Sequence, residues 1–343
     1  FVCEGVAQCD EGGVGSARLL FPLSYAAAMC FGDPVGIMAD STACADIMMA
    51  GVRAAGKCAV YLGSANEAVC AYAVRRFSLA GALLSRGGKI SLFDRFSLPP
   101  TREDERKITS LSASGIKPAE RYGESDDVSH LLSLLYEAEY PLPPLPDGCR
   151  ISDCGTHLVC SLCSHYELLY LCLTEAIHRK IRTFAVPSPF PEALTAHLVS
   201  LGASVVHYTH TPADSSENAS RAVAASMHML RDARALGELL VSYLSRTGQT
   251  LGEAIGKIPF AVNELTHPAD ADKLVLTVSA LKKEENSAES DDGVRLVYDS
   301  GCVTVIPSPE GFRLFAEAVS AETARELCAF TEDKIDNLYK NKT

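Results

Sequence analysis

The sequence contains no cluster of basic residues, no apolar run of membrane-spanning length and no short internal repeat. Its 43 Asp and Glu residues outnumber its 31 Lys and Arg residues, so the formal net charge is −12. This balance argues against nucleic acid as a partner, because a phosphate backbone is bound by clustered Lys and Arg. The best membrane candidate, 158–177, is interrupted by His165, Glu167 and Glu175, so no membrane span is expected.

Hydrophobic residues make up 47% of the 343 residues and charged residues 22%, which is an ordinary globular composition. A chain of this length accommodates two or three domains. The 13 cysteines lie inside apolar patterns, as Cys70, Cys172 and Cys328 do, and not in the dense arrangement of a small secreted scaffold. We therefore expect buried free thiols in a reducing compartment, which predicts a cytoplasmic location.

Strand-like and helix-like segments alternate through the first hundred residues. Such an alternation predicts right-handed crossovers and a mostly parallel, buried sheet. The expected strands are 34–40, 58–63, 80–85 and 89–94, and the expected helices are 17–30, 45–56 and 66–77.

The rest of the chain contains two further groups of elements after a polar stretch. In that stretch we expect helices over 101–108 and 127–139, and the Pro-rich run PLPPLPDG at 141–148 indicates a linker. The acidic run 284–293 is predicted to be a solvated loop. The other expected elements are helices 165–180, 191–202, 229–248, 250–259 and 320–339, and strands 181–187, 203–209, 294–299, 302–308 and 312–318.

These elements predict an α/β fold, with multi-domain α/β units followed by a smaller C-terminal α+β domain built on an antiparallel sheet. We expect the two α/β units to contain mixed sheets between helices. The predicted limits are 1–110 for the first unit, 111–146 for a linker, 147–258 for the second unit and 259–343 for the last domain.

The order and spacing of these segments resemble the α-D-phosphohexomutase family, the phosphoglucomutase and phosphomannomutase enzymes. The stretch DDGVRLVYDSGCVTVIPSPEGFRLFAEAVSAETARELC at 291–328 follows the family's C-terminal domain strand for strand. Residues 34–94 are similar to its first domain, and 165–259 to its third. The family's second domain has no counterpart, because 111–146 is too short for an α/β unit.

The resemblance implies a phosphoryl transfer between two hydroxyls of a sugar through a phosphoserine, with a divalent cation at that serine. The family's Thr-Ala-Ser-His-Asn-Pro loop falls between the strands that match 80–85 and 89–94. Here only SRGGK (85–89) joins them. Ser85 aligns with the nucleophile, but the His, Asn and Pro are absent, and a solvated turn serine is the simpler interpretation.

The family's metal loop has three aspartates at alternate positions before an arginine. The matching stretch, LPDGCRI, retains only Asp147 and Arg150, with Leu145 and Cys149 at the other positions. A lone carboxylate beside a thiol does not form the compact oxygen shell that Mg²⁺ requires. We therefore expect no cofactor, with Mg²⁺ needed only if the chain is an active mutase.

The phosphate-binding positions that the resemblance implies have also changed. The family's Arg-Pro-Ser-Gly-Thr becomes Ile306-Pro307-Ser308-Pro309, so the arginine that would grip a phosphate is an alkyl side chain and Ser308 is a remnant. The family's Gly-Glu-x-Ser-Gly-His sugar loop is not found near 212–226. Its Gly-Arg-Asp-Thr-Arg strand end becomes MADST, which keeps only Asp40 and replaces the arginines by Ala39 and Thr42.

A second constellation, separate from the resemblance, lies in CRISDCGTHLVCSLCSH at 149–165. Cys160 and Cys163 with a histidine could form a tetrahedral zinc site. A strong zinc signal has two ligand pairs separated by a loop, whereas these residues lie on one continuous apolar segment, so a core strand with thiols is favoured. The candidates are Cys149, Cys154, His157, Cys160, Cys163 and His165.

The leading hypothesis is a catalytically degenerate phosphohexomutase-like protein, retained to bind a protein partner or to form a homo-oligomer. One alternative is an active mutase that transfers phosphate between the 1 and 6 positions of a hexose, recruiting Ser85, Ser308 and Asp147. Another is a phosphosugar sensor that uses the cleft between domains. Under the leading hypothesis the protein is not an enzyme. An assay of phosphosugar turnover therefore separates this hypothesis from the first alternative.

Overall fold

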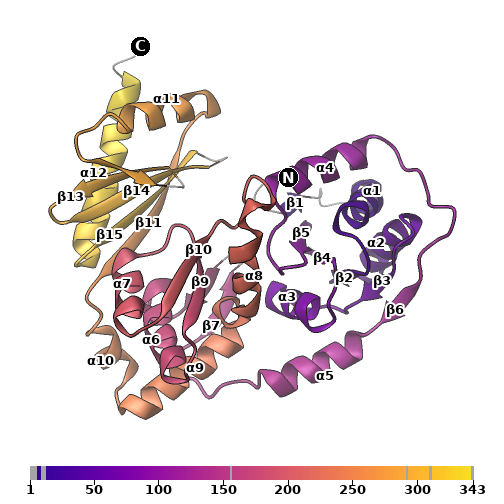
Figure 1. Ribbon diagram of the computed structural model, residues 1–343, viewed down its shortest axis with the longest axis horizontal. Coiled ribbons are helices and arrows are strands. Elements are labelled where there is room, and N and C mark those ends of the chain that lie inside the picture. Colours follow the sequence, from indigo (N-terminus) through magenta and orange to yellow (C-terminus); the bar gives the residue numbers. More distant parts are fainter. Residues whose placement is uncertain (1–5, 9–12, 155–156, 291–292, 309–310, 341–343) are drawn as a thin grey trace. The chain divides into compact units, whose positions relative to one another are not determined.

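The structure, a computed structural model, describes residues 6–8, 13–154, 157–290, 293–308 and 311–340 (Figure 1). Its chain divides into two compact units that interleave along the sequence. The predicted 147–258 domain is shared between these units, and the predicted domain limits stay a prediction. The first unit contains 1–162, 183–187 and 205–242, and the second contains 163–182, 188–204 and 243–343.

A mixed sheet forms the centre of the first unit. In the described part of the chain its order is β1-β5-β4-β2-β3-β6. Strand β2 pairs parallel with β3 and β4, and β3 pairs parallel with β6, whereas β5 pairs antiparallel with β4 and β1. The sheet is therefore mixed, as predicted for this unit, and its antiparallel pair β4–β5 is joined by a two-residue turn, which only antiparallel neighbours allow. The strands are β1 (Val6–Gln8), β2 (Val35–Ala39), β3 (Ala59–Tyr61), β4 (Gly81–Arg86), β5 (Lys89–Asp94) and β6 (Ser125–Asp127).

Helices cover both faces of this sheet, which explains why all five residues of β2 are buried. Successive strand residues point to opposite faces, so Ile37 joins the core beneath α1 and α2, while Met38 joins the core beneath α3 and α5. The helix α3 begins where the Asn66 side chain accepts a hydrogen bond from the Val69 N–H. The helices are α1 (Gly13–Phe31), α2 (Thr42–Ala54), α3 (Glu67–Arg76), α4 (Arg102–Ala113) and α5 (Ser129–Glu139).

The segment 111–146, predicted to be a linker, contributes to this first unit. Its strand β6 pairs with β3, and α5 buries Leu132 and Tyr136 against the sheet. The structure describes the whole segment, which holds one three-residue strand and one eleven-residue helix besides the end of α4. It therefore extends the first sheet and is not an α/β domain of its own.

The middle of the chain contains the strands predicted over 181–187 and 203–209 and the predicted helices, which are confirmed, whereas the hairpin of β7 and β8 and the helix α8 were not predicted. In the described residues its strands form two-stranded sheets and not the expected mixed sheet. Two short antiparallel strands, β7 and β8, are followed by helix α6, which begins with a capping box between Ser164 and Glu167. Strands β9 and β10 form a separate two-stranded sheet. The elements are β7 (Ile151–Cys154), β8 (His157–Cys160), α6 (His165–His178), β9 (Thr183–Pro187), α7 (Glu192–Ser200), β10 (Ser204–Tyr208), α8 (Asn218–Ser226), α9 (Ala233–Thr247) and α10 (Leu251–Ile255).

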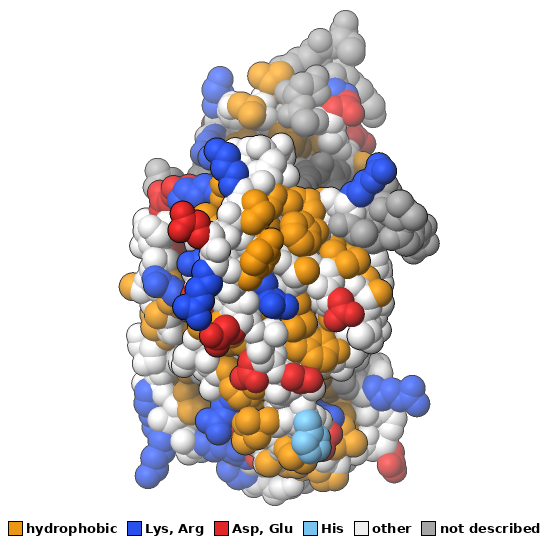
Figure 2. Space-filling model, turned by 90° about the vertical axis from the view of Figure 1, so that its right-hand side faces the viewer, with side chains coloured by type: hydrophobic (Ala, Val, Ile, Leu, Met, Phe, Trp, Pro, Cys, Tyr) orange, Lys and Arg blue, Asp and Glu red, His pale blue; other side chains and the backbone are white. Residues whose placement is uncertain are grey.

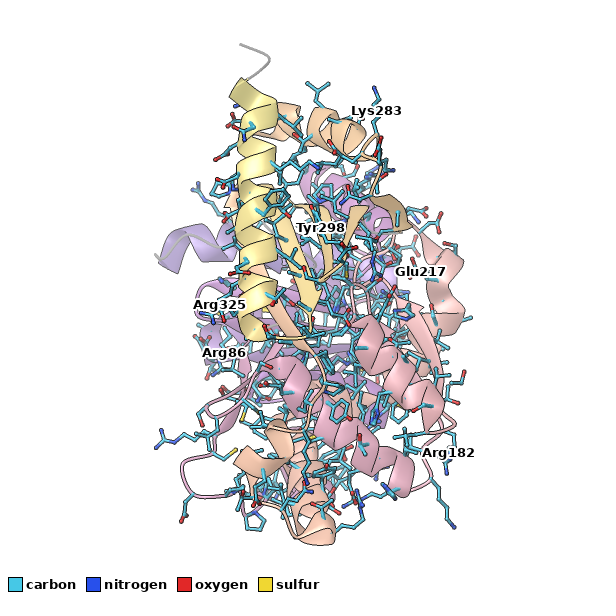
Figure 3. The ribbon with its side chains drawn as sticks, turned by 90° about the vertical axis from the view of Figure 1, so that its left-hand side faces the viewer. Arg86, Arg182, Glu217, Lys283, Tyr298 and Arg325 are labelled. Carbon is cyan, nitrogen blue, oxygen red and sulfur yellow. The ribbon has the colours of Figure 1, made fainter. Side chains whose placement is uncertain are left out.

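The C-terminal sheet is antiparallel, as predicted, with the order β11-β15-β14-β13-β12 in the described residues. Alternate residues such as Phe312 and Leu314 pack with α11 and α12, and Tyr298 lies beside α12 in contact with Phe330 (Figure 3). Strand β11 was not predicted, and β12 lies within the supposed acidic loop. The elements are β11 (Ala261–Pro268), α11 (Ala271–Leu281), β12 (Ser287–Ser290), β13 (Gly293–Tyr298), β14 (Gly301–Ser308), β15 (Gly311–Ala318) and α12 (Ala321–Lys340).

The described residues include no helix that is long and apolar enough to cross a membrane. On the face of the molecule drawn in Figure 2, hydrophobic side chains lie among both acidic and basic side chains. Exposed apolar side chains are common on soluble and membrane-associated proteins alike, so this mixture by itself assigns no partner.

The core of the C-terminal sheet gives a test of the fold. Phe312 is completely buried there, whereas Phe330 is 56% exposed. We expect Phe312→Ala to lower the free energy of unfolding by about 3–5 kcal/mol, because it leaves a cavity among packed side chains. The matched Phe330→Ala should cost less than about 1 kcal/mol. Urea denaturation of both variants measures this difference, and equal losses would contradict the assigned core.

Candidate functional site at the strand ends

The turn between β4 and β5 occupies the position where the sequence resemblance places a phosphoserine loop. Arg86 (labelled in Figure 3) pairs with Lys89, so only Gly87 and Gly88 lie between the strands. Their φ angles are +56° and +75°, the positive values that a type I′ hairpin turn requires and that glycine adopts without strain. A turn of this kind is the shortest common hairpin connection and projects no loop beyond the sheet.

Ser85 lies inside this sheet and not in the turn. It pairs with Ala39 of β2 on one side and with Ile90 of β5 on the other, and the residue is 7% exposed. Its carbonyl oxygen accepts a hydrogen bond of 3.1 Å from the Asp40 N–H. A nucleophile must reach a substrate, and this placement leaves Ser85 little surface for that contact. The phosphoserine role of Ser85 stays a prediction.

Asp40, the retained residue of the first strand-end motif, has a structural contact. Its Oδ2 accepts a hydrogen bond of 3.0 Å from the Gly87 N–H, so the carboxylate after β2 holds the β4–β5 turn. Strand ends at this edge carry polar side chains, as expected for the carboxyl ends of parallel strands. Here, however, one of those polar groups is already used to fix the backbone of its neighbour.

The stretch that aligns with the metal loop forms a β-turn. The Cys149 N–H donates to the Pro146 carbonyl at 2.9 Å, and Gly148 at the third position has φ +76°. The Asp147 side chain is exposed at the second position. Within the described residues, no group of three or more His, Cys, Asp or Glu side chains is arranged to hold a metal ion. Whether the protein binds Mg²⁺ stays a prediction to be tested in solution.

Two of the candidate zinc ligands lie together. The Cys149 and Cys160 sulfur atoms are 3.7 Å apart, and both residues are buried. Burial, followed by the neighbouring Cys160, raises the pKa of Cys149 to about 11. A thiol must lose its proton to bind zinc, so this environment disfavours the ligand form. The side chains of Cys154 and His157 lie outside the described residues, and the zinc alternative remains untested.

The segment 212–226, where the resemblance places a sugar loop, contains α8 and a buried arginine. Arg221 is completely buried, and its guanidinium donates to Asp94 Oδ2 at 2.7 Å and to the Pro99 carbonyl at 2.6 Å. Asp94 in turn accepts hydrogen bonds from the Phe96 and Leu98 N–H groups. The cation of this segment therefore holds the end of β5 and is not available to a sugar.

A buried histidine follows in the 3₁₀ turn His228–Arg231. The Nε2 atom of His228 lies 2.9 Å from Asp232 Oδ2, and the Tyr136 hydroxyl donates to that same oxygen at 2.8 Å. Burial lowers the pKa of His228, and the opposing attraction of Asp232 is smaller. The second Asp232 oxygen accepts hydrogen bonds from the first N–H groups of α9. This cluster joins α5 to α9 and is structural in character.

The last candidate, Ser308, closes the β14–β15 hairpin. It pairs with Gly311, and its hydroxyl donates to the Gly311 carbonyl at 3.3 Å. Residues 309–310, which complete this loop, lie outside the described residues. Two strand positions earlier, Ile306 stands where the resemblance places an arginine, and it pairs directly with Arg313 of β15.

Arg313 is a candidate that the sequence interpretation missed. Because it is the cross-strand partner of Ile306, its side chain lies on the same face of the sheet as the replaced arginine would. The Arg313 Nε atom is buried and has no hydrogen-bond partner among the described residues. The nearby Tyr166 hydroxyl donates to Glu264 at 2.9 Å. Burial raises the pKa of Tyr166, and the positive charge of Arg313 acts in the opposite direction. A guanidinium thus lies beside the remnant loop, supplied by the neighbouring strand.

Other charged groups of this sheet are paired with each other. The Glu317 carboxylate accepts hydrogen bonds from the Glu192 and Ala193 N–H groups at 2.8 and 2.7 Å, so it caps helix α7. Arg295 pairs with the Glu192 side chain and contacts the Cys302 sulfur at 3.1 Å. These contacts join α7 to the C-terminal sheet, and they leave Arg313 as the guanidinium with an unused N–H group among these residues.

No protein-family model matches the chain, and no curated protein sequence is similar enough to match it. Two solved structures are similar over nearly their whole length. One is a protein assigned as a phosphomannomutase from Thermus thermophilus, with a TM-score of 0.68 and 14% identity over 96% of this chain and 97% of that chain. The other is a phosphoglucomutase/phosphomannomutase family protein from Burkholderia thailandensis, with a TM-score of 0.70 and 10% identity over 98% and 97%.

These similarities identify the fold. The chain has the phosphohexomutase architecture, which confirms the fold class predicted from its segments. At sequence identities this low, structural similarity establishes the fold alone. The activity of the two similar proteins is therefore not assigned to this chain. The differences at the β4–β5 turn, the Pro146–Cys149 turn and the Ile306 position must therefore be weighed for this chain on their own chemistry.

The buried His228 predicts a pH dependence of stability. Because its folded pKa is lowered, the unfolded chain takes up a proton more readily below about pH 6.5, and the free energy of unfolding should fall as the pH decreases. His228→Asn should flatten this slope between pH 7 and 5 by up to about 1.4 kcal/mol per pH unit. The exposed His130→Asn is the control. Denaturation at several pH values measures how the free energy of unfolding changes with pH. If the slope in His228→Asn equals that of the unaltered protein, His228 is not the source of the pH dependence.

Proposed function

We propose that this chain is a degenerate phosphohexomutase-like protein that no longer transfers phosphoryl groups and serves in binding or assembly. The observation that carries the proposal is the two-residue Gly87–Gly88 turn at the position of the phosphoserine loop. A nucleophile that forms a covalent phosphoryl intermediate must project toward its substrate. The short turn and the burial of Ser85 favour a role without that step.

The charge requirements of the reaction support the same proposal. A phosphoryl group in transfer carries negative charge on several oxygens, which enzymes offset with metal ions and with Arg or Lys side chains already in position. In this chain the aligned positions are Ala39, Thr42 and Ile306, and Asp147 is exposed in a turn. Loss of one oriented donor typically costs about 3 kcal/mol. With several such donors lost, we expect the rate of phosphoryl transfer to fall to the background level.

A cytoplasmic, soluble role without a resident metal is part of this proposal. The ten cysteines whose side chains the structure describes are all free thiols, which suits a reducing compartment. The partner would be a protein or a second copy of the chain, and neither nucleic acid nor membrane is involved. A metal would enter only with an active mutase, where Asp147 would be one of its ligands.

The turnover test uses a coupled mutase assay with the 1- and 6-phosphates of glucose and mannose in the presence of Mg²⁺. We expect no detectable interconversion, because the aligned positions supply neither the metal ligands nor the arginine clamps of the reaction. Intact-mass measurement should find no phosphate on Ser85. Activity that disappears in the Ser85→Ala variant would refute the proposal.

A second candidate function is binding of a phosphosugar without turnover, and Arg313 is the observation that favours it. Arginine recognises phosphate through paired N–H groups with fixed geometry. Arg313 has an unused Nε–H on the face of the remnant loop, next to Ile306 and within two residues of Gly311, where the Ser308 hydroxyl is bound. A phosphate on this face would gain a cation that replaces the missing arginine.

A thermal-shift titration with hexose 1- and 6-phosphates, with and without Mg²⁺, tests this second candidate. A ligand that binds only the folded protein stabilises it, by about 2.7 kcal/mol at one hundred times its Kd. We expect Arg313→Met to abolish any such shift. Arg325→Met, which alters an exposed arginine on α12, should keep it (Figure 3). A shift that survives in Arg313→Met excludes this site.

A further inference from the structure

The surface at which helices α6 and α7 end concentrates positive charge in an acidic protein. The whole chain has a net charge of −12, yet Glu192 is the single acidic residue within 176–213. Arg179, Lys180 and Arg182 follow the end of α6, and all three are exposed. They are too few to form the basic cluster that a phosphate backbone requires, so sequence analysis assigned them no role.

The fold places a fourth cation beside these three. The buried Glu175 carboxylate accepts a hydrogen bond of 2.7 Å from Arg246 of α9, and the Arg179 guanidinium lies 3.9 Å from the other carboxylate oxygen. Two guanidinium groups thus share one carboxylate, which leaves an excess of positive charge. Lys180 and Arg182 have no carboxylate partner in the part of the chain that the structure describes.

Two apolar side chains adjoin these cations. Arg182, labelled in Figure 3, donates a hydrogen bond of 3.1 Å to the Leu201 carbonyl, which holds the chain after α6 against the end of α7. Leu201 is 37% exposed, and Val199, in the last turn of α7, is 54% exposed. The basic–apolar surface is defined by these side chains, which are Arg179, Lys180, Arg182, Arg246, Val199 and Leu201.

The backbone at Lys180 points to a role for its side chain. Lys180 is the second residue after α6 and has φ +70°, while Gly202, the second residue after α7, has φ +82°. Glycine is the usual residue at this position, because an L side chain is strained in the left-handed region. Helix α7 follows this rule and α6 does not. Residues held in such a conformation are frequent at functional positions.

The helix dipole accounts for only part of this arrangement. Cations near a helix C-terminus stabilise the helix, and Arg179 already places one at the end of α6. The dipole gives no reason for a lysine at a position where glycine would remove the strain. It also does not explain why Val199 is more than half exposed beside the cations. A ligand that takes up the remaining charge and covers the apolar side chains explains both features.

The size of the surface favours a short ligand over a membrane or a nucleic acid. Both of these present extended arrays of negative charge, which the rest of a chain with a net charge of −12 would repel. A short acidic segment keeps its carboxylates within reach of the four cations, and arginine binds carboxylates through paired N–H groups. Aliphatic residues between those carboxylates would contact Val199 and Leu201.

We propose that the basic–apolar surface binds an acidic segment of a partner protein in which carboxylates alternate with aliphatic side chains. Complementary charge raises the association rate and selects the partner, and the apolar contacts add affinity that salt does not screen. The inference specifies the partner for the binding role proposed above and rests on that role. Its failure would leave the results of the mutase assay and of the Arg313 thermal-shift titration unchanged.

The test measures binding of the full chain to a fluorescently labelled peptide in which Glu alternates with Leu, by fluorescence anisotropy at low ionic strength. We expect saturable binding that weakens as salt is added. Lys180→Glu with Arg182→Glu should weaken it at least about tenfold, because carboxylates then face carboxylates. Lys282→Glu with Lys283→Glu makes the same change of net charge at exposed residues after α11, where Lys283 lies far from Arg182 in Figure 3. This control should keep its affinity within about twofold.

Two single variants separate binding from stability. Lys180→Gly should keep or raise the melting temperature, since glycine adopts this backbone conformation without strain, yet weaken peptide binding about fivefold through loss of a cation. Val199→Asn should weaken binding about threefold by removing an apolar contact. Val275→Asn, at a position of α11 that is 72% exposed, is its matched control and should bind normally.

The same measurements can overturn the proposal. Absence of saturable binding, or equal affinity in the Lys180 and Arg182 double variant, would show that these cations hold no acidic segment. A lower melting temperature in Lys180→Gly would assign the lysine to the helix end alone. Tighter binding to anionic lipid vesicles or to RNA than to the peptide would contradict the class of partner. Dimerisation that is lost in the double variant would identify a second copy of the chain as the occupant instead.

Discussion

The first unit depends on the ion pair between Arg221 and Asp94. The two residues are 127 positions apart in the sequence, and the pair joins the end of β5 to α8. Arg221 is completely buried and Asp94 nearly so, and the Asp94 carboxylate also fixes the turn that follows β5. Breaking a buried pair by removing one partner leaves an uncompensated charge and typically costs about 3–5 kcal/mol. The pair is one of the contacts that join residues 205–242 to the N-terminal sheet within the same compact unit.

The elements that sequence analysis found are those whose residues are buried on periodic faces. Strand β2 is an uninterrupted apolar run, and α3 begins at an asparagine cap, so both were predicted within a few residues. Strands β11 and β12 were missed. Most residues of β11 are half-buried or exposed, and β12 lies within an acidic run, so neither shows the apolar pattern of a strand. Both are specified by pairing with neighbours, which local sequence does not contain.

Sequence analysis could identify only those candidate site residues that align with a family motif. Ser85, Asp147 and Ser308 were named as candidates because they stand at motif positions, but Ser85, interpreted as a solvated turn serine, is a buried residue of strand β4. Arg313 could not be found in this way. It is seven residues from Ile306 in the sequence, and only the register of β14 and β15 brings the two onto one face. When a residue on one strand takes the place of a residue lost from the neighbouring strand, it can be recognised only once the register of the two strands is known.

The Gly87–Gly88 turn has a consequence for how the chain could change. A Cβ added at Gly87 would meet no atom within 4 Å, so the tip of the hairpin is open to solvent. Turn tips of this kind are where natural and engineered insertions are best tolerated. The entropic cost of a longer loop rises slowly, by about 0.6 kcal/mol for each doubling of its length. The scaffold beneath the turn could therefore accept a longer loop with little loss of stability, which makes this hairpin a point at which new chemistry could be grafted onto the sheet.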